Sequence, residues 1–380
     1  MPVDFGLNPA QMLEWQDLQR GSGKVTTTVD VTDLAGNHLG SLSDLAVHGK
    51  LLVDRRARRS TRALALTMAD PNGIVAFSTD TPSRTALGFN RMLEVAVETY
   101  LPSLGETVRC PIFTGPVTGH RRDGRTIRVE GHGKEILGLD ELCDTLTVKA
   151  TTPVTDAIAT IMTKAGETRF ALPDLPDRLP VTMSLGPHDR PFHAAQMLAR
   201  SIGRELYYRP DGFLALRQLS TVPTYTFRAD DTGEVNAGSV RTWDTLDGFF
   251  NAVEVTGAPP RGPKKQVWRR VEVPIGHDLA PGDLGRRIPH RVHNRYIATN
   301  TMAERIGRQD LDEALLAVTR VRFDATPVWH ALEGDMVQLD SDDLLIPFRL
   351  DKFAHSIGTA GRHVMTVGVH TDTAPLEVVQ

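Results

Sequence analysis

The strongest constraint on the fold is a succession of short strand patterns in the first third of the chain. In residues 91–100, Leu93, Val95 and Val97 alternate with Glu94 and Glu98. A period of two is typical of a β-strand with one buried face. Similar strand-forming runs occupy residues 24–31, 45–53, 62–69, 108–117 and 126–131.

Turn-forming sequences separate these strands. They are Ala35-Gly36-Asn37, Asp70-Pro71-Asn72-Gly73 and Arg122-Asp123-Gly124. Gly, Pro, Asn and Asp favour tight turns because they adopt the required backbone angles or bond their own backbone. Short strands punctuated in this way predict a β-barrel or a sandwich. We assign this first barrel to residues 25–150.

Residues 1–24 form a predicted N-terminal arm. Asn8 followed by Pro9 is a helix start, and Met12, Leu13 and Trp15 would let the short helix dock elsewhere. Residues 20–24 have the composition of a phosphate-binding loop but not its pattern. Its first glycine is replaced by Leu18 and its Ser/Thr by Val25, so no nucleotide site is expected.

The pattern changes at residue 151 and predicts an inserted α/β module over residues 151–242. In its first helix Thr152 is the expected cap, Pro153 the first residue and Gly166 the stop. The buried stripe of that helix is Val154, Ile158, Ile161 and Ala165. A second helix is predicted at 190–202, with Phe192, Ala195, Leu198, Ala199 and Ile202 on its apolar face. A hairpin follows, with strands at 205–209 and 213–217.

Strand patterns return after Phe249 and predict a second barrel over residues 243–380. Its strands are expected at 251–257, 267–274, 317–325, 335–339, 348–355 and 362–370. A helix at about 299–315 interrupts them, and Gly307 predicts a bend there because the apolar stripe changes side. Residues 258–265 are too rich in proline for regular structure. The expected fold class is mainly β with α+β insertions: two similar β-barrel domains plus a small α/β module.

Composition excludes several classes of protein. The 380 residues carry a net charge of −4, which argues against a surface that is basic throughout for nucleic acid. No stretch approaches the roughly 18 apolar residues of a membrane-spanning helix, and the first residues lack a secretory signal. Cys110 and Cys143 are too few for a disulfide framework and are expected to be small buried residues. We therefore expect a chain that is made and kept in a reducing cytoplasm, or that leaves it without the export machinery, and that is not inserted in a membrane.

The motifs of catalysis and metal binding are weak or missing. The thirteen histidines include the pairs His188 with His193, His290 with His293 and His363 with His370, but none has the helical spacing of a zinc protease. No nucleophile elbow is present. A pair of carboxylates such as a glycosidase uses could arise by chance anywhere among 47 acidic residues, so the sequence neither supports nor excludes this activity. We predict no catalytic, cofactor-binding or metal-binding residues and no cofactor.

Two charge clusters remain. The run from Arg55 to Arg59 lies between two predicted strands and reads as a solvated loop, with a subunit contact as the first functional alternative and nucleic acid as the second. Residues 340–343 contain three aspartates and a serine. They predict an acidic hairpin tip, because the spaced ligands and glycine of a calcium-binding loop are absent.

Taken in order, several segments resemble the phage tail hub family, the four-domain baseplate hub proteins of contractile tails and their relatives in long non-contractile tails. The segments that resemble its first barrel are residues 93–97, 112–117, 125–130 and 134–137. The helices at 155–164 and 192–203 and the hairpin at 205–217 match its middle region. Residues 251–257, 299–315, 319–323, Pro327 and 332–337 resemble its second barrel.

The resemblance covers nearly the whole chain after residue 25 and implies a structural role with no catalytic residues to transfer. It implies three copies with two barrels each, a homotrimer ring that joins a sixfold tail tube to a threefold tip and leaves a channel for DNA. The partners would be the tube or distal tail protein above and the tip or spike protein below, in a virion assembled in the host cytoplasm. We expect an acidic or neutral lumen, with Arg55, Arg56, Arg58 and Arg59 facing a neighbour or solvent.

Two other functions stay open at this point. One is a tail-tip cell-wall hydrolase. The other is a host-surface carbohydrate or receptor-binding protein, against which an aromatic content of only 6% argues mildly.

Overall fold

The computed structural model describes residues 8–20, 25–43, 45, 47–57, 59–73, 75–76, 85–89, 91–230, 234–257, 266–341, 344–358 and 363–368. The predicted proline-rich loop at 258–265, Arg58, His370 and the last two aspartates of the acidic tip lie outside these residues. No helix in the described part of the chain is long and apolar enough to span a bilayer.

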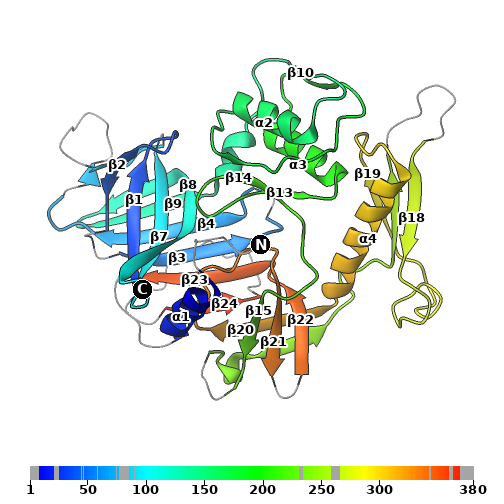
Figure 1. Ribbon diagram of the computed structural model, residues 1–380. Helices are drawn as coiled ribbons and strands as arrows, with labels where there is room; N and C mark the ends of the chain where they lie inside the picture. Colours follow the sequence, from blue (N-terminus) through cyan, green and yellow to red (C-terminus); the bar gives the residue numbers. More distant parts are fainter. Residues whose placement is uncertain are drawn as a thin grey trace.

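One large antiparallel sheet dominates the molecule (Figure 1). Its strands, from one edge to the other, are β16 (Arg241–Asp244), β20 (Thr319–Ala325), β24 (Met365–Val367), β23 (Lys352–Gly358), β3 (Val47–Asp54), β4 (Arg62–Ala69), β9 (Thr126–His132), β8 (Glu106–Asp123), β7 (Met92–Leu101), β1 (Val25–Thr32) and β2 (His38–Ser41). All six strands predicted in the first third are present; five agree with their expected ranges to within two residues, and β8 extends beyond its expected end.

In this sheet, strands from the N-terminal third of the chain pair with strands from its C-terminal part. β3 pairs with β23 from Asp54 opposite Lys352 to His48 opposite Gly358. A single apolar core runs under both sets of strands, from Val29 and Phe113 to Phe323 and Phe353. The mainly β class is therefore confirmed. The pairing within this sheet does not by itself show two similar barrels, so those remain a prediction.

Strand β8 is longer than predicted and changes partner along its length. Residues 106–116 pair with β7, and residues 117–123 pair with β9. Gly115 permits the close approach at this corner, since a Cβ there would lie 1.9 Å from the carbonyl oxygen of His132. The final part, from Gly119 to Asp123, has no apolar alternation, which is why the sequence pattern ended at Val117.

Smaller sheets complete the β structure. They are β10 (Leu146–Val148) with β12 (Met183–Leu185); β11 (Phe170–Ala171), β14 (Leu214–Arg217) and β13 (Glu205–Tyr208); β15 (Tyr225–Arg228), β21 (Met336–Ser341) and β22 (Leu344–Arg349); β18 (Trp268–Glu272), β17 (Ala252–Thr256) and β19 (Pro289–His293); and β5 (Val75–Ala76) with β6 (Thr85–Ala86). Two 3-10 helices lie at Lys134–Gly138 and Ala237–Ser239.

The strand predicted at 348–355 is two strands. β22 ends at Arg349 and β23 begins at Lys352, with the chain turned between them. The turn is held because Leu350 exchanges backbone hydrogen bonds with Gly334 and Asp335, while the carbonyl oxygen of Asp351 accepts from the N–H of Arg55. β21 and β22 pair from Met336 opposite Arg349 to Ser341 opposite Leu344.

The N-terminal helix α1 (Pro9–Arg20) begins as predicted. Asn8 and Gln11 cap it reciprocally, since each side-chain oxygen accepts a hydrogen bond from the other residue's backbone N–H, at 3.0 and 2.9 Å. Trp15 is fully buried in the large core, so the helix docks through this residue.

Helices α2 (Val154–Lys164) and α3 (Pro191–Ser201) pack together over their own core (Figure 1). The predicted cap at Thr152 is wrong: Pro153 occupies that position, and α2 starts one residue later. The reason is that the carbonyl oxygen of Thr152 already accepts from the N–H of Leu179, so the first helical bond runs from the N–H of Ala157 to the carbonyl oxygen of Pro153. Gly166 ends α2 with φ +89°, as expected.

Helix α4 (Asn300–Leu316) covers β17 and β18 and forms with β19 a lobe that stands apart in Figure 1. We call α4, β17, β18 and β19 the lobe. Thr299 caps the helix by accepting from the N–H of Met302 at 3.1 Å. Gly307 lies within a continuous helix, and a Cβ there would lie 2.8 Å from Val271. Its role is close helix–sheet contact, not the predicted bend.

Candidate functional site: an ionic junction and a basic groove

The turn after β3 carries the centre of a buried ionic cluster. Arg55 forms ion pairs with Asp351 at 2.6 Å, Glu313 at 2.8 Å and Glu205 at 3.2 Å, and its side chain is only 7% exposed. These carboxylates come from the β22–β23 turn, α4 and β13. One guanidinium thus holds together the large sheet, the lobe and the α/β module.

The cluster continues away from Arg55. Glu205 also binds Arg217 of β14 at 2.8 Å. Arg217 donates to the backbone carbonyl oxygen of Glu333 and lies 4.2 Å from the ring centroid of Tyr207. The carboxylate of Glu333, fully buried, pairs with Arg62 of β4. We call this set the junction: Arg55, Arg62, Glu205, Arg217, Glu313, Glu333 and Asp351.

Burial and pairing act in opposite directions on these groups. Burial alone would lower the pKa of Arg55, but Asp351, Glu205 and Glu313 raise it above its ordinary value. Burial would likewise raise the pKa of Glu205, and the positive charges of Arg217 and Arg55 instead hold it below its usual range. Both groups therefore stay charged, because each buried charge is compensated by its neighbours.

The expectation that Arg55 faces solvent or a neighbouring subunit is wrong. Its partners are 150, 258 and 296 residues away in sequence, so no local sequence pattern could predict these contacts. Arg56 and Arg59 are exposed as predicted, although Arg56 also reaches Asp351 at 2.7 Å. A solvated loop thus describes the run only in part.

The other cysteines and histidines that the sequence analysis considered lie in different places in the structure. Cys110 is buried, which raises the pKa of its thiol, but Cys143 is exposed in the loop before β10, so the expected burial of both cysteines is half wrong. His188 lies beside Glu141, with its Nδ1 2.7 Å from a carboxylate oxygen. His363 is in edge-to-face contact with Trp329. Among the described residues, no group of three or more His, Cys, Asp or Glu side chains could hold a metal ion.

Two buried histidines had no sequence signal. His355 of β23 stacks on Trp329, with ring centroids 4.7 Å apart, and burial lowers its pKa to about 3. Burial lowers the pKa of His330 to about 4. Both rings are neutral at pH 7 and form part of the core.

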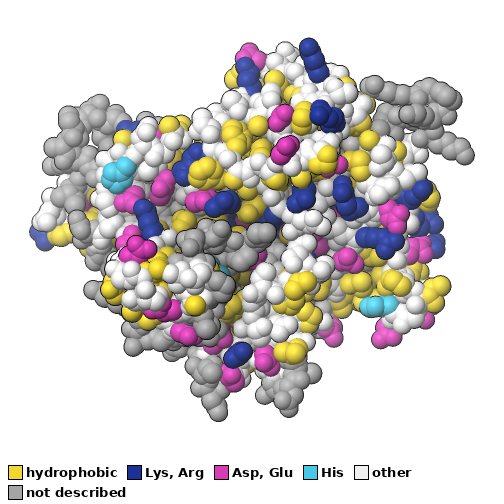
Figure 2. Space-filling view, in the orientation of Figure 1, with side chains coloured by type: hydrophobic (Ala, Val, Ile, Leu, Met, Phe, Trp, Pro, Cys, Tyr) yellow, Lys and Arg dark blue, Asp and Glu magenta, His cyan; other side chains and the backbone are white. Residues whose placement is uncertain are grey.

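A groove of about 1040 Å³ opens beside the junction. Its walls are the exposed face of α3, the edge strands β13 and β19, and residues 55–57 and 59–61 after β3. Figure 2 shows dark-blue basic side chains gathered over this region, between the α/β module and α4. Eight arginines and four carboxylates line it, in a chain whose net charge is −4.

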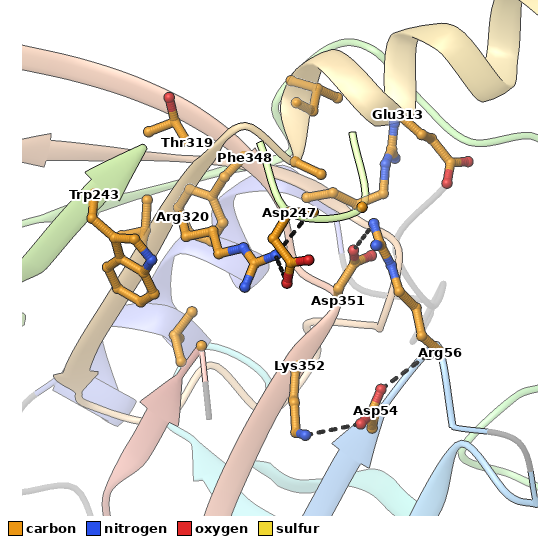
Figure 3. Close-up of a pocket in the computed structure, with 17 residues that line it drawn as sticks. Asp54, Arg56, Trp243, Asp247, Glu313, Thr319, Arg320, Phe348, Asp351 and Lys352 are labelled. Carbon is orange, nitrogen blue, oxygen red and sulfur yellow. Dashed lines mark hydrogen bonds and ion pairs between the residues drawn. The ribbon is translucent and has the colours of Figure 1, made fainter. Parts of the chain in front are cut away.

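A smaller cavity of about 410 Å³ lies on the other side of Arg56 (Figure 3). Its charges are matched within the cavity: Lys352 pairs with Asp54 at 3.0 Å, and Arg320 lies 3.9 Å from Asp247. Four cations and four carboxylates line it, so it has no charge surplus with which to attract a charged ligand.

No protein-family model and no curated protein matches the sequence. Solved structures of phage tail proteins do match the fold. The 43 kDa tail protein of prophage MuSo2 from Shewanella oneidensis is 14% identical, with a TM-score of 0.56 over 90% of this chain and 97% of its own. A tail protein from Neisseria meningitidis MC58 is also 14% identical, with a TM-score of 0.58 over 90% and 95%.

A third match is the prophage tail protein gp18 from Listeria monocytogenes EGD-e, at 11% identity and a TM-score of 0.51 over 91% of this chain and 95% of its own. The resemblance to phage tail proteins is therefore confirmed at the level of the fold. It extends over nearly the full length of these proteins and is not confined to one shared domain.

Proposed function

We propose that this chain is a structural subunit of a phage tail tip, a hub protein of the baseplate. The observation that carries the proposal is the fold likeness to three tail proteins over about nine tenths of this chain and nearly all of theirs. At 11–14% identity the likeness concerns the fold, and the role is our inference from it.

The junction supports a structural role. Arg55, whose side chain is 7% exposed, ties three parts of the molecule together through ion pairs with partly buried carboxylates, and these contacts help to fix the relative positions of the parts. Removing Arg55 would take one shared cation from three carboxylates at once, which is costly. A hub that transmits force between a tube and a tip needs parts held in this way.

The proposed assembly is a homotrimer ring. If each chain contributes two similar β domains, three chains supply six comparable units to a sixfold tube and keep threefold symmetry toward the tip. A closed ring lets one gene product build the collar. Its partners would be the tube or distal tail protein on one side and the tip or spike protein on the other, with DNA passing through the centre during ejection.

We also propose that the chain is not an enzyme. This rests on the tail-protein fold and on the absence of any catalytic motif in the sequence. Incubation of purified chain with cell-wall peptidoglycan should release no soluble fragments. Release that a single carboxylate or histidine substitution abolishes would overturn this part and favour the hydrolase.

The decisive experiment on the assembly is a cryo-electron reconstruction of the tail tip of the particle that carries this chain. We expect three copies on the tail axis, between the tube and the tip, with an acidic or neutral bore. Six copies in the ring, or a peripheral position like that of a fibre, would overturn the hub assignment. An arginine-lined bore would refute the expected lumen charge but not the ring.

A further inference from the structure

The groove beside the junction has positive charge that nothing in the described chain neutralises. Its four lining carboxylates are already engaged: Glu205 and Glu313 by Arg55, Asp310 by Arg200 at 2.7 Å, and Glu135 by the hydroxyl of Thr61. By contrast, no carboxylate of the described residues forms an ion pair with Arg59, Arg190 or Arg204.

These three arginines are placed around the groove by different elements. Arg59 is exposed in the turn after β3, Arg190 is the exposed residue before α3, and Arg204 is half-buried between α3 and β13. Their convergence on one groove in an acidic chain is a concentration of charge that favours an anionic ligand.

The groove also offers an open strand edge. β19 is the last strand of its sheet and has only β17 beside it. The N–H of Asn294 donates to Thr256 of β17 at 3.0 Å. In a parallel strand, the backbone N–H and C=O groups of successive residues point alternately to the two neighbouring strand positions. Since Asn294 points its N–H to β17, the backbone groups of Arg291 and His293 point away from β17. Both residues line the groove, so an extended chain could add to this edge.

Opposite β19, the exposed face of helix α3 forms the other wall of the groove and carries both polar and apolar side chains. His193, Gln196, Met197 and Arg200 follow the spacing of one helical face and are all exposed, whereas the other face of α3 is core. Met197 is 44% exposed and provides an adaptable apolar contact. The side-chain amide of Asn294 donates to the carbonyl oxygen of Met197 at 2.8 Å and ties the two walls together.

From this geometry we propose that the groove binds an extended, acidic peptide segment of a neighbouring tail protein. The segment adds as a strand to β19, and its carboxylates reach Arg59, Arg190 and Arg204. Five residues of β19 span about 17 Å at roughly 3.3 Å per residue, enough for a short segment. The proposal rests on the proposed function only for the partner being a tail protein.

A peptide fits the groove better than nucleic acid does. Both ligands would be attracted by the arginines, but only a peptide backbone can exchange hydrogen bonds with the open edge of β19. Nucleic acid is thus the alternative that the experiment has to separate.

The test uses the full purified chain and a fluorescein-labelled peptide of three Glu-Thr-Glu-Val repeats, measured by fluorescence anisotropy. The triple variant Arg59→Glu, Arg190→Glu, Arg204→Glu should bind at least about tenfold more weakly than the wild type. The matched control, Arg125→Glu, Arg128→Glu, Arg322→Glu, makes the same charge change at exposed residues outside the groove and should bind within about threefold of the wild type.

A second peptide separates charge from strand addition. Replacing each Thr and Val by Pro keeps all carboxylates, removes the N–H of every second residue and disfavours strand pairing, and should weaken binding to the wild-type chain at least about tenfold. Equal binding of the two peptides would overturn strand addition at β19.

Two further outcomes would overturn the proposal. If a 12-base-pair DNA duplex displaces the peptide from the wild-type chain at equal concentration, the groove is a nucleic-acid site. If the groove variant changes the native mass of the chain while the control does not, the occupant is a second copy. Copy number in the tail tip is measured separately, so failure of the ring and failure of the groove remain distinguishable.

Discussion

Two arginine–carboxylate clusters in this molecule have similar composition and very different surroundings. In the junction, one arginine holds three carboxylates; on the open face of the lobe sheet, one carboxylate, Glu254, holds Arg270 at 2.7 Å and Arg291 at 3.3 Å. The side chain of Arg55 is 7% exposed, whereas that of Arg291 is 81% exposed. The composition of a cluster therefore does not decide its contribution to stability.

Sequence separation differs as well. The lobe residues are 16 and 37 positions apart and lie on neighbouring strands, so their cluster forms wherever the small sheet forms. The junction needs segments up to 296 residues apart to be in place together. The lobe cluster can therefore form once the small sheet has formed. The junction can form only when the whole chain has folded, so its loss indicates that the fold is incomplete.

The largest expected effect comes from removing the centre of the junction. Arg55→Met leaves three carboxylates without their shared cation and should lower the free energy of unfolding by about 3–5 kcal/mol. Arg56→Met is the matched control: Arg56 binds the same Asp351 but is 57% exposed, so it should cost less than about 1 kcal/mol. Urea unfolding followed by tryptophan fluorescence measures both. Equal costs would mean that burial does not distinguish the two arginines.

Acid should weaken the large sheet before the lobe, because both buried histidines of the described chain lie outside the lobe. The pKa of His355 is about 3 and that of His330 about 4 in the folded chain, against an ordinary value of 6.5. The unfolded chain therefore binds more protons below pH 6.5. Stability is full above that pH and falls toward the folded pKa values.

Between pH 7 and pH 5 each of the two histidines should cost about 2 kcal/mol, at roughly 1.4 kcal/mol per pKa unit. His355→Phe keeps a ring against Trp329 and should remove about half of this pH dependence in urea unfolding. Hydrogen exchange at pH 5 should rise in β23 before β17. An unchanged pH slope in the variant would show that His355 is not the group that titrates.

A smaller effect compares a glycine beside the junction with a glycine in the loop between β18 and β19. Gly334 and Gly285 have φ of +85° and +72°, and alanine in such a conformation costs roughly 1–2 kcal/mol. At Gly334 the added Cβ would also lie 2.7 Å from the guanidinium of Arg217, whereas at Gly285 the space is open. Thermal unfolding should show a larger loss for Gly334→Ala. A larger loss for Gly285→Ala would contradict the central place of the junction.

The smallest effect is expected on the open face of the lobe. Glu254→Gln removes the carboxylate that both arginines share, yet solvent can replace it at Arg291, so the melting temperature should stay within the error of the measurement. Adding 0.5 M NaCl should leave the difference between wild type and variant unchanged. A shift comparable to that of Arg55→Met would make the lobe cluster a structural element in its own right.

The sequence predicted what local patterns encode. Strands β4, β7 and β9 follow alternation within a few residues, and α2 and α3 follow an apolar stripe that ends at a glycine. These parts of the fold needed no knowledge of distant contacts.

The pairing of distant segments was not predictable in the same way. That β23 lies beside β3, or that Arg55 rather than Arg56 is buried, depends on residues more than 100 positions away. The groove was missed for the same reason: Arg59, Arg190 and Arg204 belong to three separate segments, and only the fold brings them together. The run of arginines in the sequence indicated a positive charge, but it did not indicate which of these side chains point into the protein and which into the groove.

The pairing of β3 with β23 has a consequence for the order of synthesis. β3 is complete about 300 residues before β23, which at roughly 5–20 residues per second is an interval of about 15–60 seconds. During that interval β4 can pair with one edge of β3 while its other edge has no partner. An unpaired edge can join another nascent chain. Completion of β23 is therefore the step that removes this hazard, and a ribosome stalled late in the message would leave it exposed.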